Sequence, residues 1–98
     1  MIKLTPAQRQ HLKGLAHPIS PVVIIGEKGL TEAVIKEIDR ALNAHELIKI
    51  KAGSDEKETR SLWMTEICQQ VSASPVQQIG KMLVIYKQAE KPVIQLPR

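Results

Sequence analysis

The chain has 98 residues, with 14 Lys and Arg against 10 Asp and Glu, and a net charge of +4 at pH 7. A chain this short buries only about 60 to 65% of the surface that its unfolded form exposes, which supports one core and excludes a multi-domain enzyme. The 43% hydrophobic and 24% charged residues exclude the disordered class. Phe is absent, and Trp63 and Tyr86 are the two aromatic residues, which argues against an RNA-binding surface built from several stacked rings.

The single cysteine and the three histidines show no pattern of a catalytic or metal site. Cys68 stands alone, which excludes an intramolecular disulfide framework and a cysteine-based zinc site, and we expect it to be buried and inert. The histidines lack metal-ligand spacing, and none stands near Cys68 in sequence to act as its base. The sequence shows no secretory signal pattern and no apolar run near the ~18 residues of a membrane span. We therefore expect a cytoplasmic protein with no enzyme activity, no cofactor, no metal, no membrane association and no small-molecule substrate.

A helix is predicted near the amino terminus. Thr5 is a good N-cap, Pro6 suits the first helical position, and Gln8 completes a capping box. The helix ends at His17, because a residue before a proline, here Pro18, avoids helical geometry. Its predicted apolar stripe consists of Leu12, Leu15 and Ala16.

Two strands flank a second predicted helix. Residues 21–26 form a short, mostly β-branched apolar run, which is typical of a strand buried on both faces. Residues 31–44 carry apolar side chains at helical spacing, and residues 46–52 alternate, which predicts a helix and then a strand with one apolar and one mixed face. The apolar face of that strand consists of Ile48, Ile50 and Ala52, and the mixed face of Leu47, Lys49 and Lys51.

A helix and a hairpin are predicted in the last third of the chain. Asp55 and Glu58 match a capping box that opens a third helix. The apolar residues of this helix are Leu62, Trp63, Ile67 and Val71. Residues 76–79 and 82–86 predict two strands joined by a two-residue turn at Gly80 and Lys81. Residues 88–98 form a polar tail, in which residues 93–96 can add an edge strand.

Together these elements predict a single α+β domain over residues 1–98, with a core of about 4–87 and the order αβαβαββ. Right-handed crossovers make the strands on either side of a helix parallel, and the terminal hairpin is antiparallel, so we expect a mixed four-stranded sheet. Positive charge gathers in the two ends of the chain, because residues 1–30 and 67–98 each carry 4 basic and 1 acidic side chains. If the two ends meet in the fold, they form one basic face.

The most informative motif is Gly26-Glu27-Lys28-Gly29, between a predicted strand and a predicted helix. Glycine permits positive φ and close approach to the backbone, and the amides at a helix N-terminus favour an anion, so this turn can hold a phosphate. Lys28 and Thr31 add a charged and a neutral donor. A tight connection that binds nothing is the alternative. The motif matches neither a nucleotide-binding P-loop nor the dinucleotide fingerprint.

Several longer motifs follow one another along nearly the whole chain. They are His11-Leu12-Lys13-Gly14-Leu15-Ala16-His17-Pro18, Pro21-Val22-Val23, Gly26-Glu27-Lys28-Gly29-Leu30-Thr31-Glu32, Glu46-Leu47-Ile48-Lys49, Gln78-Ile79-Gly80-Lys81 and Val84-Ile85-Tyr86. This ordered set resembles the chloroplast RNA splicing and ribosome maturation (CRM) domain family, and within it the stand-alone bacterial YhbY type. The resemblance implies an αβαβαββ fold similar to the carboxy-terminal domain of translation initiation factor three.

The resemblance also implies RNA binding through a Gly-x-x-Gly loop that clamps the backbone, as in KH domains. It further implies association with precursors of the large ribosomal subunit during ribosome assembly, so the expected partner is ribosomal RNA in those precursors. We expect the protein to be a monomer. The candidate contacts are the loop residues Gly26, Glu27, Lys28 and Gly29, the adjacent Thr31, and the basic residues Arg9, Lys13, His17 and Lys81.

Each basic candidate outside the loop has a structural alternative. Arg9 and Lys13 can be solvated surface charges, His17 can cap the last carbonyls of the first helix, and Lys81 can keep the hairpin soluble. The alternative function comes from a different class: a protein–protein adaptor in the translation machinery, whose basic face docks on an acidic partner.

Overall fold

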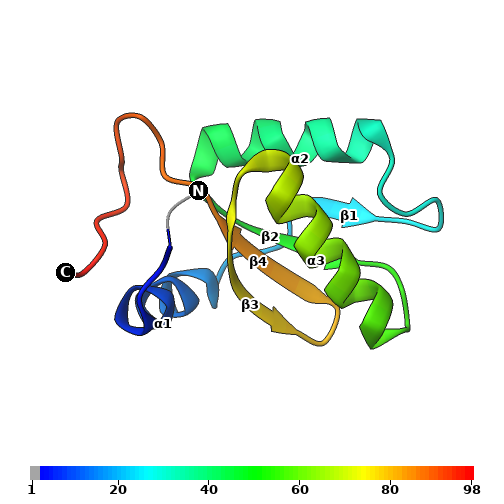
Figure 1. The fold of residues 1–98 in the computed structure, drawn as a ribbon, viewed down its shortest axis with the longest axis horizontal. Coiled ribbons are helices and arrows are strands. Elements are labelled where there is room, and N and C mark those ends of the chain that lie inside the picture. The colour runs from blue at the N-terminus through cyan, green and yellow to red at the C-terminus, as the bar shows by residue number, and fades with distance from the viewer. Residues whose placement is uncertain (1–2) are drawn as a thin grey trace.

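The computed structural model describes residues 3–98 and confirms the predicted α+β class, with three helices and a mixed four-stranded sheet (Figure 1). The elements follow the predicted order αβαβαββ and are α1 (Pro6–Ala16), β1 (Val23–Ile25), α2 (Glu32–His45), β2 (Leu47–Ala52), α3 (Lys57–Val71), β3 (Ser74–Ile79) and β4 (Met82–Tyr86). The strand order across the sheet is β1-β2-β4-β3. β1 is parallel to β2, and β4 is antiparallel to both of its neighbours.

Two hydrophobic clusters lie on opposite faces of the sheet. The larger one joins α2 and α3 to strand residues such as Ile48 and Ile85. The smaller one joins α1 to Leu47, Val84 and Tyr86. Successive side chains of a strand point to opposite faces of the sheet. Leu47 and Ile48 are neighbours in β2 but belong to different clusters, so the two clusters lie on opposite faces. The sheet is therefore covered by two helices on one face and by α1 on part of the other.

The first two helices each begin after a threonine cap, of which the sequence predicted the first. Thr5 Oγ1 accepts a hydrogen bond from the Gln8 amide at 3.1 Å, and Gln8 Oε1 accepts one from the Thr5 amide at 3.0 Å, so the predicted capping box of α1 is confirmed. Thr31 is the N-cap of α2, with its hydroxyl oxygen accepting from the Val34 amide at 3.2 Å. α2 therefore begins one residue later than predicted, at Glu32.

The prediction that the first strand is buried on both faces is wrong. β1 has three residues and lies at the edge of the sheet, where it pairs with β2. Val23 and Ile25 are buried, whereas Ile24 is 64% exposed. The reason is that α1 packs over Leu47 and Tyr86, toward one end of this face, and leaves Ile24 uncovered at the other end.

The predicted capping box of the third helix is also wrong. α3 begins at Lys57, and its N-cap, Glu56, makes no side-chain capping bond. Asp55 forms an ion pair with Lys81 instead, at 2.7 Å. Ile67 and Val71 of the predicted apolar stripe are buried, whereas Leu62 is 69% exposed because it lies outside the buried face of the helix. That face consists of Met64, Ile67, Cys68 and Val71.

The hairpin forms as predicted, with Gly80 at φ +54° in its two-residue turn. β3 begins at Ser74, earlier than predicted, and contains a register irregularity between Pro75 and Gln77. The glycine matters here because this left-handed backbone conformation disfavours a side chain.

The predicted edge strand over residues 93–96 is wrong. The segment is not in the sheet, and its amides bind a buried carboxylate instead. Glu46 is 3% exposed and accepts hydrogen bonds from the backbone amides of Ala89 at 3.0 Å, Val93 at 2.8 Å and Ile94 at 3.0 Å. Ile94 and Leu96 pack against the smaller cluster, so the C-terminal segment lies beside α1 (Figure 1). No helix within residues 3–98 is both long enough and apolar enough to span a membrane.

Candidate nucleic-acid interface

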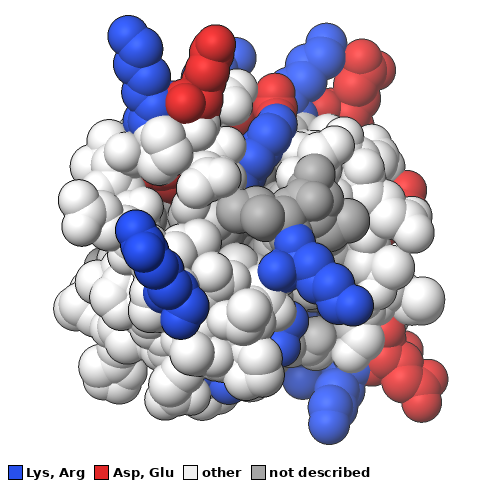
Figure 2. Space-filling view, turned by 60° about the vertical axis from the view of Figure 1, so that its left-hand side comes forward, with Lys and Arg blue, Asp and Glu red and all other residues white. Residues whose placement is uncertain are grey.

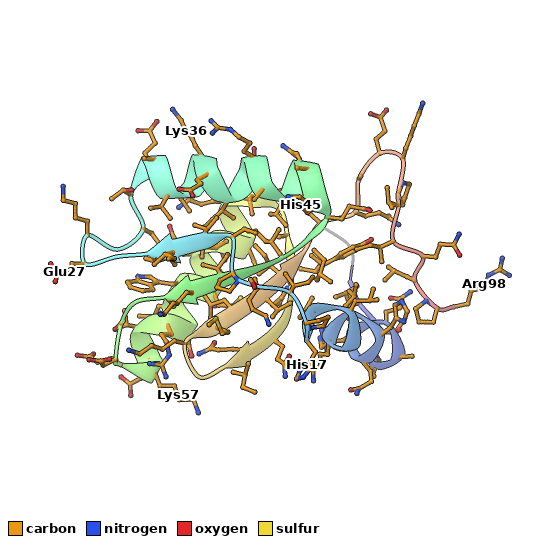
Figure 3. All side chains as sticks on the ribbon, turned by 180° about the vertical axis from the view of Figure 1, so that it is seen from behind. His17, Glu27, Lys36, His45, Lys57 and Arg98 are labelled. Carbon is orange, nitrogen blue, oxygen red and sulfur yellow. The ribbon has the colours of Figure 1, made fainter. Side chains whose placement is uncertain are left out.

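The glycine loop is a tight turn between β1 and the N-cap of α2. The Gly29 amide donates to the Gly26 carbonyl at 3.0 Å, and the Thr31 amide donates to the Gly29 carbonyl at 3.1 Å. Gly29 has φ +71°, in the left-handed region that favours glycine. In Figure 3 the loop projects from one end of the molecule, and the labelled Glu27 side chain points outward, away from the body of the domain. The loop thus presents its backbone to solvent just before a helix N-terminus.

Gly26 differs from Gly29, because the fold does not require a glycine there. Its φ is not positive, and a Cβ built on it meets nothing within 4 Å. A side chain at this position would therefore point into open space without strain. The absence of one leaves the backbone at Gly26 accessible to a ligand at close range.

Two residues that the sequence did not single out as site residues support the loop from below. The Gly53 amide donates to the Ile25 carbonyl at 2.9 Å, and a Cβ at Gly53 would collide with the same carbonyl oxygen. The Trp63 ring lies under Gly29, 3.5 Å from the position of a Cβ there. The sequence indicated only that Trp63 belongs to the apolar residues of its helix, because both contacts join segments far apart along the chain.

Three of the predicted basic residues share one flank of α1. Arg9, Lys13 and His17 are spaced four residues apart, which places them along one side of a helix. Arg9 lines a hollow together with Gln77 and Gln78 of β3, and the His17 carbonyl accepts a hydrogen bond from Lys49 Nζ of β2 at 3.4 Å. This flank, which we call the α1 flank, therefore runs along the sheet from β3 to β2.

The structure does not bring the α1 flank and the glycine loop into one cluster. In Figure 3 the labelled Glu27 lies at one end of the molecule, whereas the labelled His17 lies near its middle, well away from the loop. The sheet surface between them carries Lys49 and Lys51, two further basic residues. Their alternation with Ile48 and Ile50 was the sequence signal that placed them together on the mixed face of this strand.

Lys81 lies at the same end of the sheet as the glycine loop. Its carbonyl accepts from the Ala52 amide at 2.7 Å, next to the bond that joins Gly53 to Ile25. Its ammonium pairs with Asp55, and this hydrogen-bonded lysine lowers the pKa of the Asp55 carboxyl. Of the predicted basic candidates, Lys81 is thus the one held in an ion pair within the described chain.

The charges of the molecule are arranged unevenly. None of the four strands contains Asp or Glu, and most carboxylates lie on α2, α3 and the turn before α3. Figure 2 looks toward the end of the molecule where the C-terminal segment and α1 lie. Its carboxylates lie mostly along the upper edge and right-hand margin, where lysine and arginine side chains stand among them, and further lysine and arginine side chains lie across the middle and at the lower edge. Within residues 3–98 no three His, Cys, Asp or Glu side chains gather as a metal site.

Comparisons with known proteins agree on one family and one fold. A sequence model described as the CRS1 / YhbY (CRM) domain matches residues 4–87. An RNA-binding protein of Haemophilus influenzae is 49% identical over 98 residues, which cover 100% of this chain and 99% of that protein. A probable RNA-binding protein of Pseudomonas aeruginosa is 44% identical over 89 residues, 91% of this chain and 86% of its own. The solution structure of a hypothetical protein from Staphylococcus aureus has a TM-score of 0.86 and 34% identity, covering 97% of this chain and 100% of that one.

Proposed function

The chain belongs to the CRS1/YhbY (CRM) domain family, and we propose that it binds RNA and holds the sugar-phosphate backbone at the loop formed by residues 26–29. The observation that carries this proposal is the exposed backbone at Gly26, where the fold would accept a side chain and none is present. A phosphate in contact with this backbone would also lie near the N-terminus of α2, whose free amides favour an anion.

The side chains around the loop fit this role. Lys28 is exposed at the tip of the turn and supplies a positive charge, while Glu27 points outward and so need not lie against a phosphate. Thr31 uses its hydroxyl oxygen to cap α2, which leaves its hydrogen free to donate to a phosphate oxygen. The loop and the start of α2 therefore offer the exposed backbone at Gly26, the free amides of the helix N-terminus, one ammonium and one hydroxyl to the same ligand.

A substitution at Gly26 tests the clamp directly. Gly26→Asp places a carboxylate where the RNA backbone would approach, and we expect the variant to fold normally and to lose at least tenfold in affinity for RNA. Asn43→Asp, on the exposed end of α2, makes the same change in net charge away from the loop and should bind within twofold of the wild type. Equal binding by both variants would remove the loop from the interface.

We further propose that the RNA partner is ribosomal RNA in precursors of the large ribosomal subunit, and that the protein acts in ribosome assembly. The resemblance of its motifs to a ribosome maturation family supports this choice of partner. Sedimentation of a native extract at low and high salt tests it, because the protein should migrate with large-subunit precursors at low salt and leave them at high salt. Survival of the complex after complete nuclease digestion would instead favour a protein–protein adaptor.

A further inference from the structure

The sheet face on which α1 packs is left uncovered by any helix at its other end. Four residues form a row across this open end, paired strand by strand in the sheet: Ile24, Lys51, Met82 and Ile79. Directly paired residues of neighbouring strands point to the same face, so the row spans the sheet over a width of about 14 Å. Ile24 is 64% exposed and Ile79 is 59% exposed, although large aliphatic side chains are normally buried. We call this row and the adjoining Val22 and Lys49 the open sheet face.

The open sheet face is both apolar and basic. Lys51 stands between two aliphatic side chains, and Lys49 lies in the next row beside Val22, which is 45% exposed. With no Asp or Glu in any of the four strands, these ammonium groups have no carboxylate partner on the strands. Such a surface repels a second copy of itself, and it complements a polyanion that also carries apolar faces.

The open sheet face also connects the two separated parts of the candidate interface. β1 leads from Ile25 directly into Gly26, so the exposed Ile24 stands at the base of the glycine loop. On the other side, Lys49 reaches the carbonyl of His17, at the end of the α1 flank. A strand held by its backbone at the loop can therefore continue over the sheet toward α1.

We propose that the open sheet face binds unpaired RNA bases, with Ile24, Met82 and Ile79 under the base faces and Lys49 and Lys51 at the phosphates. This inference rests on the proposed function and extends it from the backbone clamp to a preference for single-stranded RNA. A duplex keeps its bases stacked and paired, so it would offer mainly phosphates to this surface and gain nothing from the aliphatic row. Unpaired bases expose flat apolar faces that can cover it.

The chemistry of the row predicts weak selection among bases. Tyr86 is fully buried and Trp63 lies beneath Gly29, so neither aromatic ring belongs to the open sheet face. Aliphatic side chains contact every base similarly, and no amide or carboxylate lies in the row to read a base edge. Single-strandedness, and not sequence, is the property that the surface recognises.

Binding of one unpaired 12-nucleotide RNA and of the duplex made from it tests the proposal. Ile24→Ser and Ile79→Ser should each weaken binding of the unpaired RNA about fivefold and leave duplex binding within twofold. Leu62→Ser removes a side chain of similar exposure from α3, on the other side of the sheet, and is the matched control, expected to bind both RNAs as the wild type does. Equal losses for duplex and unpaired RNA, or no loss for either, would overturn the proposal.

The two proposals fail in different ways. If Gly26→Asp abolishes RNA binding while both isoleucine variants bind as the wild type does, the backbone clamp stands and the base-binding surface is wrong. If the wild type binds neither RNA, the proposed function itself is wrong.

Lys51→Ala gives a second readout. Loss of one phosphate contact should flatten the slope of log affinity against log salt by about 0.7. Lys36→Ala on α2 is the control and should leave the slope unchanged.

Discussion

Lys49 Nζ donates a hydrogen bond to the carbonyl oxygen of His17 at 3.4 Å, and this contact joins the middle of the sheet to the end of α1. The carbonyls at a helix C-terminus carry partial negative charge, so the ammonium is favourably placed there. Because an ammonium group has three donors, Lys49 keeps two for other partners. Since Lys49 belongs to the open sheet face and His17 to the α1 flank, the contact places these two surfaces side by side.

The first prediction concerns the charge at the tip of the glycine loop. With about three to five phosphate contacts, a single-stranded RNA should bind with a log-log salt slope of about −2 to −3.5. Lys28→Ala should weaken binding and flatten this slope by about 0.7, because one counterion fewer is released. Fluorescence anisotropy over a series of salt concentrations measures both quantities. Lys36→Ala is the control on α2, and an unchanged slope for Lys28→Ala would exclude Lys28 from the interface.

Two glycines should respond in opposite ways to the same substitution. Gly53→Ala should lower the free energy of unfolding by about 3 kcal/mol, because its Cβ collides with the Ile25 carbonyl and the backbone must move. Gly14→Ala should raise it by about 0.5 to 1 kcal/mol, because Gly14 lies inside α1 with open space around it. Urea unfolding of both variants measures the two changes. Similar stabilities would contradict the close approach of Gly53 to the end of β1.

The sequence predicts the fold well wherever the determinant is local. The capping box at Thr5, the alternation in β2 and the glycine turn at Gly80 each specify their own geometry, and all three form. The errors occur where distant parts of the chain decide. Ile24 is exposed because α1 does not reach it, and Asp55 leaves the predicted cap because Lys81 competes for its carboxylate.

In the candidate site, too, some features follow from local sequence and others from contacts between distant parts of the chain. The glycine loop and the spacing of Arg9, Lys13 and His17 can be read from neighbouring residues. The row from Ile24 to Ile79 cannot, because it depends on the register of four strands, and β4 enters the sheet between β2 and β3. The support of Gly29 by Trp63 is likewise a tertiary contact that no local pattern reveals.

The lone cysteine should be unreactive in the folded protein. Cys68 is buried in the larger cluster, and burial raises the pKa of its thiol to about 11. The thiolate is the nucleophile, so at pH 8 the native protein should react with iodoacetamide at least a hundredfold more slowly than the protein unfolded in urea. Mass spectrometry of timed samples follows the alkylation. Rapid modification of the native protein would show that α3 opens readily or that the thiol is accessible.

The last prediction concerns Glu46, which holds the C-terminal segment. Burial acts to raise the pKa of its carboxyl, but hydrogen bonds from the amides of Ala89, Ile94 and Val93 prevail, and the pKa lies below its usual value of 4.5. A depressed pKa in the folded state means that the carboxylate stabilises the fold above pH 4.5 and that this contribution is lost as the pH falls through the folded-state value. Glu46→Gln should therefore lower the free energy of unfolding by about 2 kcal/mol at pH 7, and by less at pH 3, which lies below the usual pKa of 4.5.

Urea unfolding of Glu46→Gln at both pH values measures this difference, and amide hydrogen exchange at Val93 and Ile94 reports the release of the segment. Glu37→Gln, at an exposed position of α2, serves as the control and should change stability by less than about 0.5 kcal/mol at either pH. If Glu46→Gln destabilises the protein equally at pH 3 and pH 7, the lost contribution comes from packing and not from the carboxylate. Faster exchange at Val93 and Ile94 without faster exchange in β2 would show that the segment detaches while the sheet remains folded. The reason is that the amides of Ala89, Val93 and Ile94 lose their charged acceptor, whereas the hydrogen bonds between the strands do not depend on it.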